Sequence, residues 1–106
     1  MNAERYNEII NDRLVKCTQV LCAKSDEYAT EDKLHNFKVA ANLQGCTPIT
    51  ALAGMMCKHT VSVYDLIKDN EKGKKIPKEL WDEKIVDSIN YLLLLTAMLE
   101  ETEDVV

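Results

Sequence analysis

The chain is poor in the residues that make turns and has no long apolar run. Three glycines and two prolines in 106 residues argue against a turn-rich β fold. The longest strictly apolar stretch, Leu92 to Leu95, is far too short to cross a bilayer. The N-terminus shows no apolar segment preceded by basic residues, as a secretory signal would. We therefore expect a cytoplasmic protein with no membrane partner.

Positive charge is also scarce. The chain has 13 Lys and Arg against 18 Asp and Glu, a formal net charge of -5. Because binding to duplex nucleic acid requires a basic surface, this balance disfavours a duplex partner. It does not disfavour a small nucleotide held through a divalent cation, since such sites are themselves acidic.

Familiar catalytic and metal-binding motifs are missing. The four cysteines, Cys17, Cys22, Cys46 and Cys57, include no CxxC pair, so we expect reduced thiols rather than a zinc site. The sequence has no glycine-rich phosphate loop, no GxSxG and no HExxH. Metal-assisted hydrolysis is then the one enzymatic class for which the chain has ligands to offer.

Helical periodicity is the dominant pattern present. Apolar residues recur at three- and four-residue steps in four segments. Thr47 and Pro48 form a helix start, and Gly45 suits the end of the helix before it. We predict one all-α domain over residues 1–106, a four-helix antiparallel bundle. The predicted helices run from 2 or 7 to 24, 32 to 43, 48 to 69 and 77 to 101. The apolar stripe of the first predicted helix consists of Tyr6, Ile9, Ile10, Leu14, Cys17, Val20 and Leu21.

The last helix has two distinct faces. The polar side chains of Glu83, Asp87 and Asn90 share one of them, and Leu94 and Met98 continue it. This pattern predicts a helix packed on two sides, with its polar residues facing a cleft or a neighbouring subunit. The apolar stretch 91–95 also favours a homodimer or higher oligomer built on this helix. The other face of the last helix is mainly apolar and consists of Trp81, Ile85, Ile89, Leu92, Thr96 and Leu99.

Two polar groupings on the predicted long helices are candidate sites. Carboxylates one turn apart, such as Glu83 and Asp87, can share a divalent ion, and Asn90 can add an oxygen. The alternative is the solvated back of a helix. Lys58, which shares a face with Ser62 and Asp65, is a candidate phosphate contact, and its alternative is an ordinary exposed face.

A charged segment between the first two helices is a third candidate. Asp26 and Glu27 are adjacent, and a loop can bring both to one ion. Tyr28 can stack on a nucleobase. The alternative is a solvated surface loop with no ligand.

The order of these residues resembles a known family. It runs Lys24-x-Asp26/Glu27-Tyr28, then Asn36-Phe37, Lys58 and Asp87-x-x-Asn90-Tyr91. This order resembles small phage-encoded all-α proteins, similar to the MazG-like nucleotide pyrophosphohydrolases and to families associated with phage nucleotide modification. Such proteins are oligomeric helical bundles that cut nucleoside triphosphates to monophosphate and pyrophosphate with Mg²⁺.

The resemblance implies roles for individual residues. Asp87 and Glu83 would be catalytic and hold Mg²⁺, with help from Asp26 or Glu27. The family holds its metal with an ExxE and an ExxD motif, and here Lys84 stands three residues before Asp87, which makes the pattern ExxxD. The substrate contacts would be Lys24, Tyr28, Asn36, Lys58, Asn90 and Tyr91.

Three functions follow as hypotheses. The first is a Mg²⁺-dependent nucleoside triphosphate pyrophosphohydrolase. The second is a module of the same fold that binds a nucleotide without cleaving it, which the missing ExxE favours. The third is an oligomeric helical protein that presents its acidic face to another protein.

Overall fold

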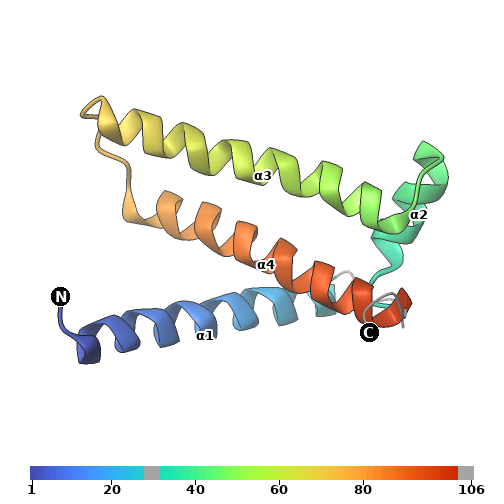
Figure 1. Ribbon diagram of the computed structural model, residues 1–106, viewed down its shortest axis with the longest axis horizontal. Coiled ribbons are helices and arrows are strands. Elements are labelled where there is room, and N and C mark those ends of the chain that lie inside the picture. Colours follow the sequence, from blue (N-terminus) through green and yellow to red (C-terminus); the bar gives the residue numbers. More distant parts are fainter. Residues whose placement is uncertain (28–31, 103–106) are drawn as a thin grey trace.

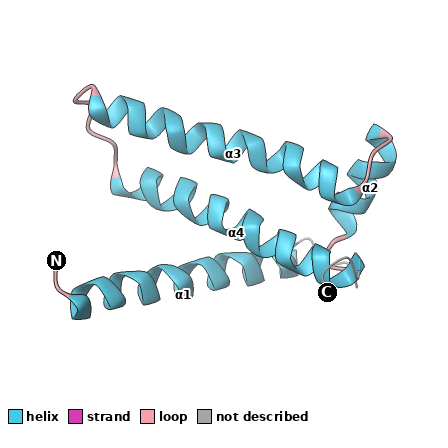
Figure 2. Cartoon of the chain, in the orientation of Figure 1, coloured by secondary structure: helices cyan, strands magenta, loops and turns pink. Residues whose placement is uncertain are grey.

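The protein is a four-helix structure. The computed structural model describes residues 1–27 and 32–102, and within these ranges every regular element is a helix (Figure 2). This confirms the predicted all-α class. No helix among the described residues combines the length and the apolar character that a membrane crossing requires. The helices are α1 (Ala3–Glu27), α2 (His35–Gln44), α3 (Pro48–Glu71) and α4 (Lys78–Thr102).

The turn between α2 and α3 forms as its residues predict. Gly45 ends α2 with a left-handed φ of 67°, a conformation that costs glycine little. The Thr47 side chain then accepts the backbone N–H of Thr50 at 3.2 Å, and Pro48 occupies the first turn of α3. The boundary predicted at Thr47 and Pro48 is therefore confirmed.

Two other helix ends differ from the prediction. α1 continues past Lys24 to Glu27, which places Asp26 on the helix rather than in a loop. α2 begins at His35 rather than at Asp32. The reason is local, because the Asp32 carboxylate accepts the backbone N–H of Leu34 at 3.0 Å and stabilises a turn that precedes the helix.

The three long helices lie in the order α1, α4, α3, with α4 in the middle (Figure 1). α3 and α4 are antiparallel, as expected. α1 and α4 run in the same direction, so the antiparallel order predicted for all neighbours is wrong for this pair. The cause is the length of α2. Its 10 residues span only about 15 Å, so α2 does not lead the chain back along α1, and α3 is the first helix to run in the opposite direction.

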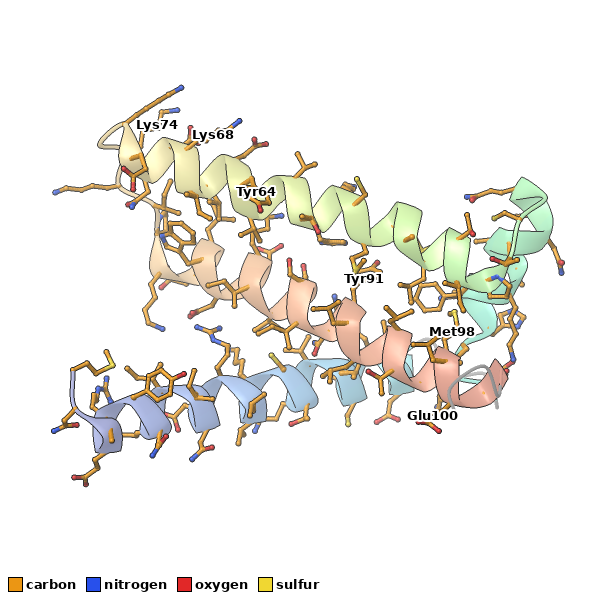
Figure 3. All side chains as sticks on the ribbon, in the orientation of Figure 1. Tyr64, Lys68, Lys74, Tyr91, Met98 and Glu100 are labelled. Atoms are coloured by element: carbon orange, nitrogen blue, oxygen red, sulfur yellow. The ribbon has the colours of Figure 1, made fainter. Side chains whose placement is uncertain are left out.

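The main core lies at the end of the molecule where α2, α3 and α4 meet. Phe37, Leu52 and Met98 pack together there from these three helices, with Leu34 just before α2. Leu52 is completely buried, and Met98 nearly so. Met98 contributes to this cluster from the C-terminal half of α4 (Figure 3). The predicted packing of α4 on two sides is confirmed, because α3 and α1 contact different faces of it.

α1 is far less buried than its pattern predicts. It makes contacts with α4 but not with α2 or α3. Cys17 is fully buried at this contact, whereas Tyr6 and Leu14 are 57% and 49% exposed. The apolar stripe predicted for this helix is therefore covered only in its C-terminal half.

A salt bridge joins the N-terminal halves of α1 and α4. Arg13 contacts Asp82 at 2.5 Å, and Lys78 contacts the other oxygen of the same carboxylate at 2.9 Å. The hydrogen bonds from Arg13 and then Lys78 lower the pKa of Asp82 from 3.8 to about 2. The lowered pKa means that the charged carboxylate is favoured in the folded protein.

We expect this carboxylate to make the fold sensitive to acid. A carboxyl with a depressed pKa stabilises the folded state above its ordinary value of 3.8, and this stabilisation is lost as the pH falls toward about 2. Asp82→Asn should therefore show a smaller fall in melting temperature than the wild type over that pH window. Asp65→Asn, at an exposed carboxylate of α3, is the control, and equal acid profiles for all three proteins would contradict the assignment.

Candidate functional site

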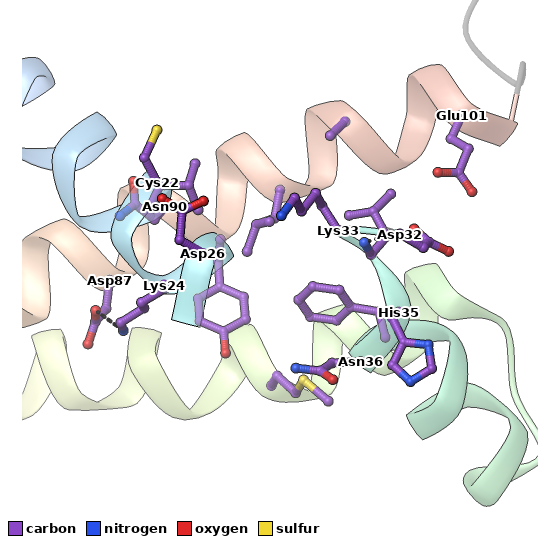
Figure 4. A pocket seen from close by; sticks show the side chains of 17 residues that line it. Cys22, Lys24, Asp26, Asp32, Lys33, His35, Asn36, Asp87, Asn90 and Glu101 are labelled. Carbon is purple, nitrogen blue, oxygen red and sulfur yellow. Dashed lines mark hydrogen bonds and ion pairs between the residues drawn. The ribbon is translucent and has the colours of Figure 1, made fainter. Parts of the chain in front are cut away.

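A cleft of about 890 Å³ lies between the C-terminal half of α1, the start of α2 and the middle and C-terminal half of α4 (Figure 4). Its volume is in the range of pockets that bind small molecules. Met55 contributes to it from α3, so all four helices take part. Its polar and charged lining includes Lys24, Asp26, Asp32, Asn36, Asp87, Asn90 and Tyr91.

The apolar part of the cleft contains two aromatic rings. Phe37 and Tyr91 are in edge-to-face contact, with ring centroids 6.4 Å apart and an interplanar angle of 80°. On its other side the Tyr91 ring lies 4.7 Å from the His59 ring, tilted by 30°. Tyr91 is thus held between α2 and α3, which gives the cleft a rigid aromatic surface.

Burial further favours the protonated form of the Tyr91 hydroxyl. Desolvation raises the pKa of Tyr91 above its usual value, and the nearby Asp87 carboxylate raises it further, while Lys24 acts in the opposite direction. The hydroxyl therefore remains protonated at neutral pH and can donate a hydrogen bond. A neutral donor of this kind suits a phosphate or carbonyl oxygen.

Asp87 lies at the centre of a charged network. Its side chain is 13% exposed, and its two oxygens lie 3.5 Å from Lys24 Nζ and 3.6 Å from His59 Nδ1. The histidine contact is an ion pair only when the imidazole is protonated. The network connects the end of α1 and the middle of α3 to α4, and each oxygen of the carboxylate already faces a basic group.

A second network holds the far end of the cleft. The ammonium group of Lys38 contacts Asp32 at 2.6 Å and also pairs with Glu101 near the end of α4. The hydrogen bond from Lys38 lowers the pKa of Asp32, and the bonds to Asp32 and Glu101 raise the pKa of Lys38. Both shifts favour the charged forms of Asp32 and Lys38, and the network ties the entry of α2 to α4.

Asn90 is the single buried polar residue in the described part of the chain, and its amide is incompletely paired. Its side chain lines the cleft from the middle of α4, and the residue is only 6% exposed. Among the residues that the structure describes, Oδ1 of Asn90 has no hydrogen-bond partner. Leaving such a group unsatisfied costs about 1–3 kcal/mol. An ordered water, or a ligand that reaches this oxygen from the cleft, would supply the missing partner.

The structure brings together most of the residues predicted to form a site. Lys24, Asp26, Asn36, Asp87, Asn90 and Tyr91 all line the cleft. Glu83 does not, because its side chain is 61% exposed and lies beside Lys84. Lys58 is exposed on α3 and is absent from the lining as well. Tyr28 and the side chain of Glu27 lie outside the described residues.

Sequence reasoning missed two contributors. His59 is half-buried on α3, and its position between Asp87 and Tyr91 was not predicted from the sequence. Its spacing of four from Met55 places both on the inward face of α3, a signal that was available. Asp32 was missed as a wall of the cleft because it was assigned to the start of a helix.

The predicted Mg²⁺ ligands are not assembled by the described residues. Of the four carboxylates proposed, Asp26 and Asp87 line the cleft and Glu83 does not. Over residues 1–27 and 32–102 no three His, Cys, Asp or Glu side chains lie close enough together to share one metal ion. The side chain of Glu27, the fourth predicted ligand, lies outside the described residues, and a Mg²⁺ cofactor stays a prediction from the resemblance.

Comparison with known proteins adds nothing to this geometry. No family model, curated protein or solved structure matches the chain. Any assignment of function therefore depends on the residues of the cleft.

Proposed function

We propose that the cleft binds a small nucleotide, in a protein of the MazG-like kind. The observation that carries this proposal is the buried amide of Asn90, whose Oδ1 lacks a partner among the described residues while the side chain lines the cleft. An unsatisfied buried oxygen is costly, so a ligand that reaches it from the cleft would gain a hydrogen bond there.

The remaining lining suits the parts of a nucleotide. The rings of Phe37 and Tyr91 offer an apolar surface for a base. Lys24 supplies a cation for a phosphate, and the protonated Tyr91 hydroxyl supplies a neutral donor. Carboxylates such as Asp26 can accept hydrogen bonds from ribose hydroxyls.

Binding without cleavage is the form of the function that the geometry favours. Both oxygens of Asp87 already face the basic groups of Lys24 and His59. A carboxylate in this arrangement orients neighbouring side chains and balances their charge. It is less suited to hold a metal ion unless both neighbours move.

A single experiment separates the outcomes. Purified protein is mixed at near-stoichiometric ratio with a panel of ribo-, deoxyribo- and cyclic nucleotides, with Mg²⁺ or with EDTA, and then removed by filtration before chromatography of the filtrate. Binding predicts that one nucleotide disappears under both conditions and returns intact when the retained protein is heat-denatured. Release of a monophosphate only with Mg²⁺ would establish the hydrolase instead, and an unchanged panel would refute nucleotide binding.

The Arg13→Gln variant controls for nucleotide binding at a second, positively charged hollow. A smaller hollow between α1 and α4 is lined by Arg5, Arg13, Lys16 and Lys78 among others, and these cations can attract any phosphate. Arg13→Gln weakens that hollow and leaves the cleft untouched. Retention of the nucleotide should be the same for this variant as for the wild type.

A further inference from the structure

The charged side chains that line the cleft are mostly acidic. With the histidine counted as neutral, the described lining has two cations, the ammonium groups of Lys24 and Lys33. Lys38 adds a third ammonium group from beside the lining, and the carboxylates still outnumber the cations. A ligand in the cleft therefore meets a surplus of negative charge. The carboxylates are those of Asp26, Asp32, Asp87 and Glu101.

Two of the ammonium groups at the cleft are engaged with these carboxylates. Lys24 Nζ lies 3.5 Å from a carboxylate oxygen of Asp87. Lys38 bridges Asp32 and Glu101, which come from the entry of α2 and the end of α4. A phosphate can share Lys24, whose side chain is 55% exposed, but it then lies near the carboxylate that Lys24 already contacts. Each further phosphate adds negative charge next to the same acids.

Asp26 carries the charge that an incoming phosphate meets without compensation. It is exposed, lines the cleft and has no ion-pair partner among the described residues. Figure 4 shows Asp26 at the same end of the cleft as Lys24 and Asp87. The cation best placed to contact a phosphate therefore lies near a carboxylate that repels additional phosphates.

The size of the cleft does not impose a limit on the phosphate chain. Its volume of about 890 Å³ lies in the upper part of the range of small-molecule pockets. A base, a sugar and several phosphates fit within such a volume. Any discrimination between nucleotides with one and with several phosphates must then come from charge.

We infer that the cleft selects nucleotides with a single phosphate over nucleotides with a phosphate chain. The inference rests on the proposed nucleotide binding and names the class of ligand. The rings of Phe37 and Tyr91 offer a surface for the base, and Lys24 offers one cation for one phosphate. A triphosphate brings more negative charge into the acidic cleft, and like charges held close together disfavour a ligand even where its other contacts are good.

Calorimetric titration with matched nucleotides tests the selection. For each base, the nucleoside monophosphate and triphosphate are titrated into the protein in EDTA, so that no divalent cation neutralises the phosphates. We expect the monophosphate that binds best to have a dissociation constant at least about 10-fold lower than its triphosphate. This ratio should shrink in about 1 M salt, because salt screens charges and does not relieve steric exclusion.

A pair of variants locates the responsible charge. Asp26→Asn should lower the ratio at least about threefold, because the triphosphate gains affinity when a nearby negative charge is removed. The ratio is the readout, since a lost hydrogen bond to the sugar would weaken both nucleotides alike. Asp65→Asn removes the same charge from an exposed site on α3 that does not line the cleft, and it should leave the ratio at the wild-type value.

The outcomes separate this inference from the proposed function. A triphosphate that binds as tightly as its monophosphate, or more tightly, refutes the selection and leaves nucleotide binding in place. A ratio that responds neither to salt nor to Asp26→Asn refutes charge as its cause. If neither nucleotide of any pair binds, the proposed function is wrong and the selection falls with it.

Discussion

Leu52→Ala should lower the free energy of unfolding by about 2–5 kcal/mol. Leu52 is completely buried on α3, where it packs against Phe37 of α2 and Met98 of α4. Truncation removes three carbons from the point where these helices meet and leaves a cavity that rigid helices cannot close. In a domain of this size the melting temperature should fall by roughly 10 to 30 °C.

A second leucine provides the matched control. Leu43 on α2 is 83% exposed, so the same truncation there removes little buried surface. Chemical denaturation of both variants should place Leu43→Ala within about 0.5 kcal/mol of the wild type. Equal losses for the two leucines would mean that the core does not lie where α2, α3 and α4 meet.

Asn90→Leu should reduce nucleotide affinity by about 10- to 100-fold without loss of folded stability. The affinity falls because the ligand loses its hydrogen bond to the buried amide, and one such bond in a desolvated site is worth this much. The stability does not fall because the substitution removes an oxygen that has no partner among the described residues of the protein. Titration calorimetry and thermal denaturation measure the two effects separately.

Ser88→Ala tests whether the loss of any buried, unpaired oxygen of α4 lowers nucleotide affinity. Ser88 lies on α4 two residues before Asn90, and its buried Oγ also lacks a partner within the described residues. It does not line the cleft. We expect this variant to retain stability and full nucleotide affinity. An affinity that Asn90→Leu leaves unchanged, or that Ser88→Ala lowers equally, would contradict the role given to Asn90.

The sequence predicts local structure well because its signals are local. Thr47 and Pro48 start a helix, and Gly45 ends one, through contacts within a few residues. The polar stripe of α4 identified the cleft for the same reason, since the spacing of Asp87 and Asn90 fixes their common face. These features require no knowledge of the neighbouring helices.

The arrangement of helices is less predictable. An apolar stripe tells which side of a helix avoids water, but not which neighbour covers it or in which direction that neighbour runs. Tyr6 and Leu14 share the stripe of Cys17, yet only Cys17 is buried, because α1 contacts α4 alone. Glu83 likewise shares a face with Asp87, but its side chain is 61% exposed and does not line the cleft.

The oligomer predicted from α4 is still untested. Leu92 remains 56% exposed on α4, which agrees with an apolar surface there. Light scattering after size-exclusion chromatography, on the wild type and on Leu92→Arg, tests this interface, and a wild type that stays monomeric would contradict it.

The central claim, that the cleft binds a nucleotide, is tested most directly by nuclear magnetic resonance. Protein labelled with ¹⁵N is titrated with each nucleotide of the panel. We predict that at least one nucleotide shifts the side-chain amide of Asn90 together with the backbone amides of Lys24 and Tyr91, while Arg13 and Lys78 in the smaller hollow do not move. If no nucleotide shifts Asn90, or if the shifts gather around Arg13 and Lys78, the cleft is not a nucleotide site.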